Sequence, residues 1–167
     1  MTIPTALIEL QNLIFKPANF QCSEVILEPE SAEYGACHFK LNNLLIRFRE
    51  AKITPTKIGQ FVTLWKRIGK SPIMPFDLSD EIDLFVICVQ KDNHFGQFVF
   101  PTSILHKQDI ISENHKGGKR AIRVYPAWDK TESRQAQKTQ SWQSKYFLEI
   151  PKDKPIDILR IKQLYCL

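Results

Sequence analysis

A glutamate and a lysine two positions apart form the pattern most typical of catalysis in this 167-residue chain. Glu50 and Lys52 fall at the end of an expected strand, in the segment FREAKI. Alternate residues of a strand point to one face, so both side chains would lie together where the strand leaves the core. The Glu50 carboxylate could hold Mg²⁺, which prefers oxygen ligands, and Lys52 could orient or deprotonate an attacking water. Alternatively, Glu50 forms an ion pair with a neighbouring Arg or Lys at a strand end.

A second group of polar residues follows directly, in the segment KITPTK. Thr54, Thr56 and Lys57 lie at the start of an expected helix over residues 57–67. The first backbone N–H groups of a helix attract anions, and two hydroxyls and two amines would join them here. We therefore expect an anion site that also includes Lys52. The alternative is ordinary helix capping beside solvated lysines.

Two basic blocks dominate the charge distribution of the chain, whose formal net charge is +5. They span residues 47–70 and 116–145, and the second contains the glycine-bearing loop KGGKR. Such blocks are typical of proteins with an anionic partner, most often nucleic acid, although a basic surface without a partner is the alternative. Trp128, Trp142 and Tyr146 either stack on bases or pack in the core. The further residues expected to contact phosphates are Lys66, Arg67, Lys116, Lys119, Arg120 and Arg123.

Hydrophobic periodicity predicts a single α/β domain over residues 1–167, with a central mixed sheet flanked by helices. Residues 82–90 are almost uniformly apolar, which indicates a strand covered on both faces. The tail from Pro151 becomes apolar again and is expected to dock onto the body of the domain. The expected strands occupy residues 23–29, 36–41, 44–53, 82–90, 95–101 and 121–126. The expected helices occupy residues 5–15, 57–67, 102–109 and 133–150.

Several functional classes find no support in the sequence. The N-terminus lacks the basic start and cleavage site of a secretory signal, and no stretch approaches the ~18 apolar residues of a membrane span. We therefore expect a cytoplasmic protein without a membrane partner. The four cysteines are scattered without a CxxC pair, which argues against a structural zinc site. No phosphate-binding glycine loop, dinucleotide fingerprint or nucleophile elbow is present.

Three blocks of the sequence together resemble the MepB-like protein family. They are FREAKITPTKIGQFVTLWKR at 48–67, DLFVICVQKDNHFGQFVFP at 83–101 and KGGKRAIRVYPAWD at 116–129, followed by QAQKTQSWQSKYF at 135–147. The resemblance runs from about residue 33 to residue 150 and covers most of the chain. The family has no settled biochemical activity, so the resemblance implies a fold rather than a mechanism.

The expected order of helix, three strands, helix and strand is also similar to the core of restriction-endonuclease-like folds. Those metal-dependent nucleases place Glu-x-Lys at the end of the third core strand, which corresponds to Glu50 and Lys52. The resemblance implies a second acidic ligand, for which Glu33 is the first candidate and Glu28 and Glu30 are the alternatives, although the nuclease pattern has Asp there. The sequence thus favours a nucleic-acid-binding domain, and the Glu-x-Lys pattern raises the hypothesis that it is a Mg²⁺-dependent nuclease. The alternative is a non-catalytic binding or regulatory protein that recognises an anionic ligand or an acidic protein partner.

Overall fold

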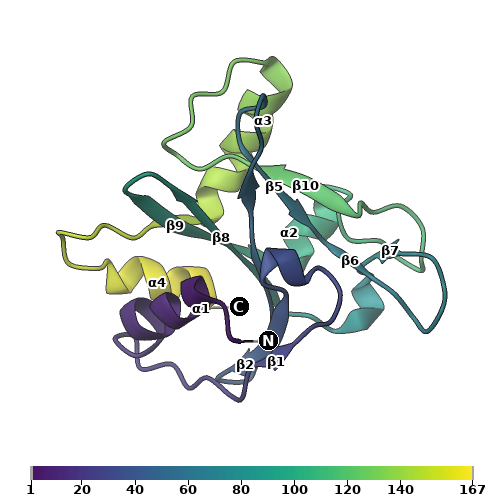
Figure 1. The fold of residues 1–167 in the computed structure, drawn as a ribbon, viewed down its shortest axis with the longest axis horizontal. Coiled ribbons are helices and arrows are strands. Elements are labelled where there is room, and N and C mark those ends of the chain that lie inside the picture. Colours follow the sequence, from purple (N-terminus) through teal and green to yellow (C-terminus); the bar gives the residue numbers. More distant parts are fainter. Residues whose placement is uncertain (1, 167) are drawn as a thin grey trace.

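The computed structural model describes residues 2–166 and shows a mixed α+β domain (Figure 1). Its largest sheet has six strands in the order β1-β2-β3-β8-β9-β11, and a smaller sheet has the order β10-β5-β4. The strands are β1 Ile26–Leu27, β2 Cys37–Leu41, β3 Leu44–Glu50, β4 Lys52–Ile53, β5 Gln60–Thr63, β6 Trp65–Lys66, β7 Met74–Pro75, β8 Leu84–Lys91, β9 His94–Pro101, β10 Ala121–Val124 and β11 Phe147–Glu149. The α-helices are α1 Thr5–Leu10, α2 Thr102–Lys107, α3 Arg134–Gln143 and α4 Ile158–Tyr165. The shorter helical turns are η1 Gln11–Phe15, η2 Ala32–Tyr34, η3 Leu78–Asp80 and η4 Ser144–Tyr146.

Strand β8 is buried on both faces of the large sheet, as its apolar sequence predicts. Val86 and its alternate neighbours pack into one hydrophobic cluster, which α1, η1 and α4 cover. Ile87 and its alternate neighbours pack into a second cluster, which the small sheet, α2 and Trp142 of α3 cover. The large sheet is therefore the middle layer of three, and the docking of the C-terminal tail is confirmed by the burial of Ile161 and Leu164.

The predicted hairpins of β2 with β3 and of β8 with β9 are confirmed by their antiparallel pairing. The central contact between β3 and β8 is parallel, so the chain must cross from the end of β3 back to the start of β8. That connection contains β4 to β7 and η3. Strands β4 and β5 join β10 in the small sheet, and β6 and β7 form a short ribbon.

The helix predicted over residues 57–67 is wrong. Residues 54–59 form a loop, and the chain then continues as β5 and β6. Val62 is buried while Phe61 and Thr63 on either side face outward, which is the two-residue period of a strand. The described connection between β3 and β8 contains only the short turn η3 and no α-helix, and the restriction-endonuclease-like order of elements is not confirmed.

Two other boundaries differ from the prediction. The helix expected over residues 133–150 ends at Gln143, and the chain continues through η4 into strand β11, an edge strand of the large sheet. The strand expected over residues 23–29 contains only the two residues of β1. No helix within residues 2–166 is both long and apolar enough to cross a membrane.

The end of β3 is joined to the first helix through Glu50. Its half-buried carboxylate lies near the backbone N–H of Ala6, in the first turn of α1. Burial raises the pKa of Glu50 above its ordinary value of 4.5, although the Ala6 N–H and the charge of Lys52 act in the opposite direction. The folded protein therefore binds a proton at Glu50 more tightly than the unfolded chain does.

The double burial of β8 predicts a large loss of stability when one of its side chains is shortened. Ile87 is fully buried, so Ile87→Ala should lower the free energy of unfolding by about 2–5 kcal/mol in urea denaturation. Ile53 is 56% exposed on β4, and Ile53→Ala is the matched control, expected within about 0.5 kcal/mol of the parent. Equal losses in the two variants would contradict the three-layer arrangement.

The raised pKa of Glu50 predicts a pH-dependent effect of removing its charge. Ionising Glu50 lowers stability, and that loss develops as the pH rises through and above the ordinary value of 4.5. Glu50→Gln keeps an oxygen acceptor for the Ala6 N–H and should therefore gain stability relative to the parent as the pH rises toward neutrality. Urea denaturation between acidic and neutral pH measures this difference. Glu33→Gln, which removes an exposed carboxylate, is the control. If the stability of Glu50→Gln relative to the parent fell as the pH rises, the raised pKa of Glu50 would be contradicted.

Candidate nucleic-acid interface

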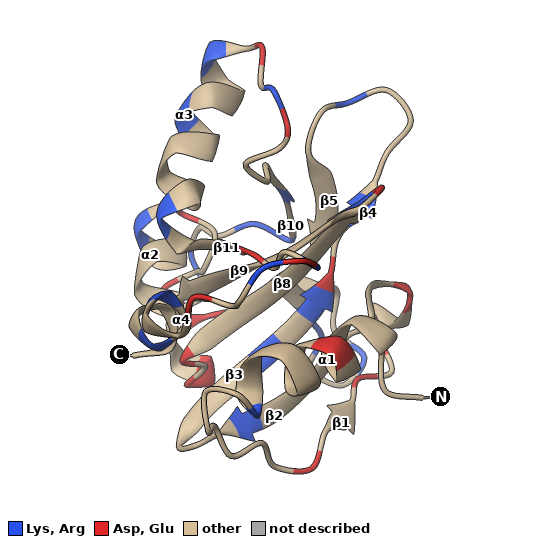
Figure 2. Ribbon diagram, turned by 90° about the vertical axis from the view of Figure 1, so that its left-hand side faces the viewer, with Lys and Arg blue, Asp and Glu red and all other residues tan. Residues whose placement is uncertain are grey.

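The outer face of the small sheet brings the predicted Lys52 and Arg123 to either side of one aromatic residue. Phe61 of β5 pairs with Lys52 of β4 on one side and with Arg123 of β10 on the other. Directly paired residues share a face of a sheet, so the three side chains form a row across it. The guanidinium carbon of Arg123 lies 6.0 Å from the centre of the Phe61 ring. Figure 2 shows this sheet beside the large one, with the loop between β4 and β5 projecting beyond both.

Tyr34 extends this row from the turn η2. Its ring centre lies 6.2 Å from that of Phe61 in an edge-to-face arrangement, and the Lys52 ammonium lies 4.8 Å from the Tyr34 ring centre. The hydroxyl of Thr63 on β5 donates a 2.9 Å hydrogen bond to the Ser31 hydroxyl just before the turn. The turn is thereby fixed against the sheet. We call the surface formed by Tyr34, Lys52, Phe61, Arg123 and the loop 54–59 the small-sheet face.

Arg123 also holds the loop of residues 54–59. Its Nη2 donates a 2.8 Å hydrogen bond to the Thr54 hydroxyl, and its Nη1 donates a 3.4 Å bond to the Gly59 carbonyl. Gly59 has a φ of +83°, and a Cβ there would meet the Tyr125 ring at 2.6 Å, so only glycine fits this bend. The loop, with Thr56 and Lys57, lines an open groove of about 520 Å³. Thr54, Thr56 and Lys57 thus lie together as predicted, but on a strand-connecting loop rather than at a helix N-terminus.

A second hollow continues the small-sheet face toward α3. It has a volume of about 340 Å³ and lies between β10 and α3, with Arg123 and Tyr125 on one wall and Gln135 and Thr139 on the other. Lys119, another residue expected to contact phosphates, also lines it. Basic groups therefore border both hollows, with Arg123 between them.

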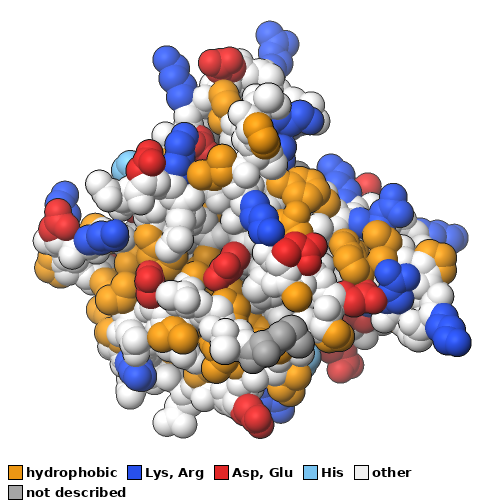
Figure 3. All heavy atoms as spheres, viewed as in Figure 1, with side chains coloured by type: hydrophobic (Ala, Val, Ile, Leu, Met, Phe, Trp, Pro, Cys, Tyr) orange, Lys and Arg blue, Asp and Glu red, His pale blue; other side chains and the backbone are white. Residues whose placement is uncertain are grey.

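The other predicted anion-binding residues lie elsewhere. Lys66 and Arg67 belong to a separate pocket beside β3. Lys116 and Arg120 are exposed in the loop 113–120, which the Asp109 carboxylate anchors through the Gly118 N–H at 3.2 Å. In Figure 3, basic side chains crowd the right of the view, which corresponds to β6, β7 and this loop in Figure 1.

The two carboxylates expected to hold a metal lie in different elements. Glu33 is exposed on η2, whereas Glu50 ends β3 and contacts the start of α1. Ala51 still donates to the Cys88 carbonyl of the large sheet, but Lys52 already pairs with β5, so Glu50 and Lys52 belong to different sheets. Within residues 2–166, no three His, Cys, Asp or Glu side chains come together in a way that could hold a metal ion.

Sequence reasoning missed the two aromatic rings of the small-sheet face. Phe61 falls within the helix expected over residues 57–67, and its alternation with buried Val62 is the signal in the structure's burial pattern that marks a strand instead. Trp128, Trp142 and Tyr146 are partly buried and pack against the second hydrophobic cluster, as Tyr34 also does. Trp128 nevertheless lines the groove beside the loop 54–59, and Trp142 lines the second hollow. The Trp128 ring also stacks on His94, with ring centres 4.9 Å apart.

Comparison with known proteins gives two matches and one negative result. The family model described as MepB-like matches residues 28–149. A solved structure titled "Crystal Structure of MepB" is 30% identical and superposes with a TM-score of 0.76, covering 90% of this chain and 99% of that one. No curated protein matches the sequence significantly. The extent of the family match and the shared fold agree with the blocks recognised in the sequence, and the chain belongs to the MepB-like family.

Proposed function

We propose that this protein binds nucleic acid through the small-sheet face, and that unpaired bases stack on its aromatic rings. The observation that carries the proposal is the row in which Lys52 and Arg123 flank the Phe61 ring across three strands. Proteins that bind single strands combine a basic groove along the phosphates with aromatic rings that accept bases. Both components are present here within one continuous surface.

The exposure of the face supports this function. Lys52 and Lys57 are exposed, and no carboxylate within the described residues forms an ion pair with either. Tyr34 and Phe61 are only partly buried, so their rings keep surface that a base could cover. Bases inside a duplex are stacked on one another, so ring stacking of this kind favours single strands.

The alternation of cations and rings predicts two different kinds of defect. Lys52→Ala should weaken binding to single-stranded DNA or RNA and reduce the slope of log K against log salt by about 0.7, because one phosphate contact is lost. Tyr34→Leu should weaken binding by about 1–3 kcal/mol without changing that slope, because stacking is lost and charge is not. Fluorescence anisotropy with oligonucleotides of about 16 nucleotides, measured over a range of salt concentrations, separates the two effects.

The matched control is Lys40→Ala, which removes an exposed strand lysine from β2 in the large sheet and should leave binding unchanged. A duplex bound as tightly as the single strand, or a Lys40→Ala defect equal to that of Lys52→Ala, would contradict the proposal. The same oligonucleotides incubated with Mg²⁺ test the nuclease hypothesis. Cleavage that Glu50→Gln and Lys52→Ala both abolish would add a hydrolytic step to binding.

Absence of nucleic-acid binding in every condition would overturn the proposal. The alternative of a non-catalytic protein that recognises an anionic ligand or an acidic protein partner would then be the next to test.

A further inference from the structure

A second basic region, separate from the small-sheet face, surrounds a pocket of about 350 Å³ between β3 and the β6–β7 ribbon. Four cationic side chains line it, and three carboxylates oppose them. The cations are Arg47, Arg49, Lys66 and Arg67, and the carboxylates are Glu28, Glu30 and Asp80. We call it the arginine pocket. Its lining therefore carries one unbalanced positive charge.

The unbalanced charge is located at the two arginines of β3. Arg47 and Arg49 are alternate residues of one strand, so they project from the same face of the large sheet. Both donate to the single carboxylate of Glu28, Arg49 at 2.5 Å. Both guanidinium groups also lie over the Phe76 ring, at 5.4 and 5.8 Å from its centre. The Glu28 carboxylate thus forms ion pairs with two guanidinium groups.

Arg49 is an unusual residue to bury, because its side chain is only 2% exposed. Its Nη1 donates to Glu28 and to the Phe48 carbonyl, whereas its buried Nε has no hydrogen-bond partner among the described residues. Burial lowers the pKa of Arg49, and the neighbouring Glu28 charge acts in the opposite direction. A buried charge with an unused donor is costly, and an added anion would reduce that cost.

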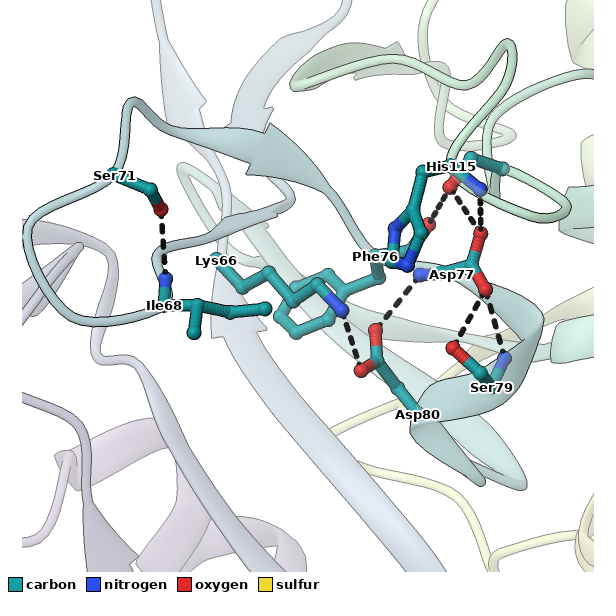
Figure 4. Close-up of polar contacts among 9 residues, drawn as sticks. Lys66, Ile68, Ser71, Phe76, Asp77, Ser79, Asp80 and His115 are labelled. Carbon is teal, nitrogen blue, oxygen red and sulfur yellow. Dashed lines mark hydrogen bonds and ion pairs between the residues drawn. The ribbon is translucent and has the colours of Figure 1, made fainter.

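The opposite wall of the pocket is fixed by hydrogen bonds. Lys66 runs past the Phe76 ring and donates a 2.5 Å bond to Asp80 (Figure 4). Asp80 accepts in turn from the backbone N–H of Asp77 at 2.8 Å, as part of a capping box at η3. Arg67 at the rim donates to Glu30 at 2.7 Å. The cations are therefore held in place before any ligand arrives, which reduces the entropy lost on binding.

We infer that the arginine pocket binds a small molecule that carries a phosphate or carboxylate group, with the anion accepting from the Arg47 and Arg49 donors that Glu28 leaves unused, among them the Arg49 Nε–H. Guanidinium groups match both anions because they present several N–H donors in one plane. The pocket volume falls within the range of small-molecule sites, and Phe76 and Trp65 supply an apolar wall. The inference is independent of the proposed nucleic-acid binding, because the two surfaces share no residue.

The test uses inorganic phosphate and benzoate as probes, with chloride at matched ionic strength as the reference. Each probe is titrated into the ¹⁵N-labelled full chain, and the Nε–H resonance of Arg49 is followed by NMR. At least one probe should shift that resonance saturably and raise the Tm, and a response to phosphate or to benzoate identifies which anion the pocket prefers. An Arg49 resonance that neither probe moves would overturn the inference.

Two variants and a control assign the site. Arg47→Gln should weaken binding of the active probe by ~10-fold or more, because a charge-assisted contact is lost. Arg67→Gln changes only a half-exposed rim residue and also weakens binding, which keeps the test available if Arg47→Gln does not fold. Arg134→Gln, an exposed change on α3, should have no effect. Affinity unchanged in both pocket variants would place the anion elsewhere and overturn the inference.

Discussion

Strand β8 imposes the constraint on which the rest of this structure depends, because its apolar side chains project toward both faces of the large sheet. Burial of each large apolar side chain contributes about 1.5–3 kcal/mol, so neither face can remain in water. Helices α1 and α4 cover one face, and the small sheet with α2 and α3 covers the other. The main structural role of the small sheet is therefore to cover the second hydrophobic cluster. Its inner residues, such as Val62 and Val124, are buried for that reason, and its outer residues are left free to form a binding surface.

The parallel pairing of β3 with β8 has a second consequence. A parallel pair needs a long connection, and in this protein the connection contributes residues to both basic regions described above. It supplies Lys52, Phe61 and the loop 54–59 to the small-sheet face, and Lys66 and Arg67 to the arginine pocket. The solved MepB structure shares the overall fold at 30% identity, and a shared fold does not by itself specify what the surface binds.

The two basic regions differ in how their charges are balanced. In the arginine pocket each cation has a carboxylate partner, and the excess charge arises because Arg47 and Arg49 share Glu28. On the small-sheet face, Lys52 and Lys57 are exposed, and Arg123 bonds to a hydroxyl and backbone carbonyls rather than to a carboxylate. Exposed charges without partners attract a polyanion at long range, whereas a partly neutralised pocket selects a small anion by geometry. The two regions therefore suit different ligands.

The sequence by itself determined the features that depend on neighbouring residues. The two hairpins, the double burial of β8 and the docking of the tail follow from local apolar patterns, and the family blocks were recognisable without coordinates. Residues 57–67 were assigned wrongly because their apolar side chains fit both a helical and a strand period. Residues 60–63 form a strand because they pair with β4 on one side and with β10 on the other. A local sequence pattern does not reveal these two partner strands. Only the tertiary structure could place Arg123 against Thr54, 69 positions away in the chain, because that contact depends on the register of three strands. The basic composition could therefore be read from the sequence, whereas the fold decided how those residues divide between the small-sheet face and the arginine pocket.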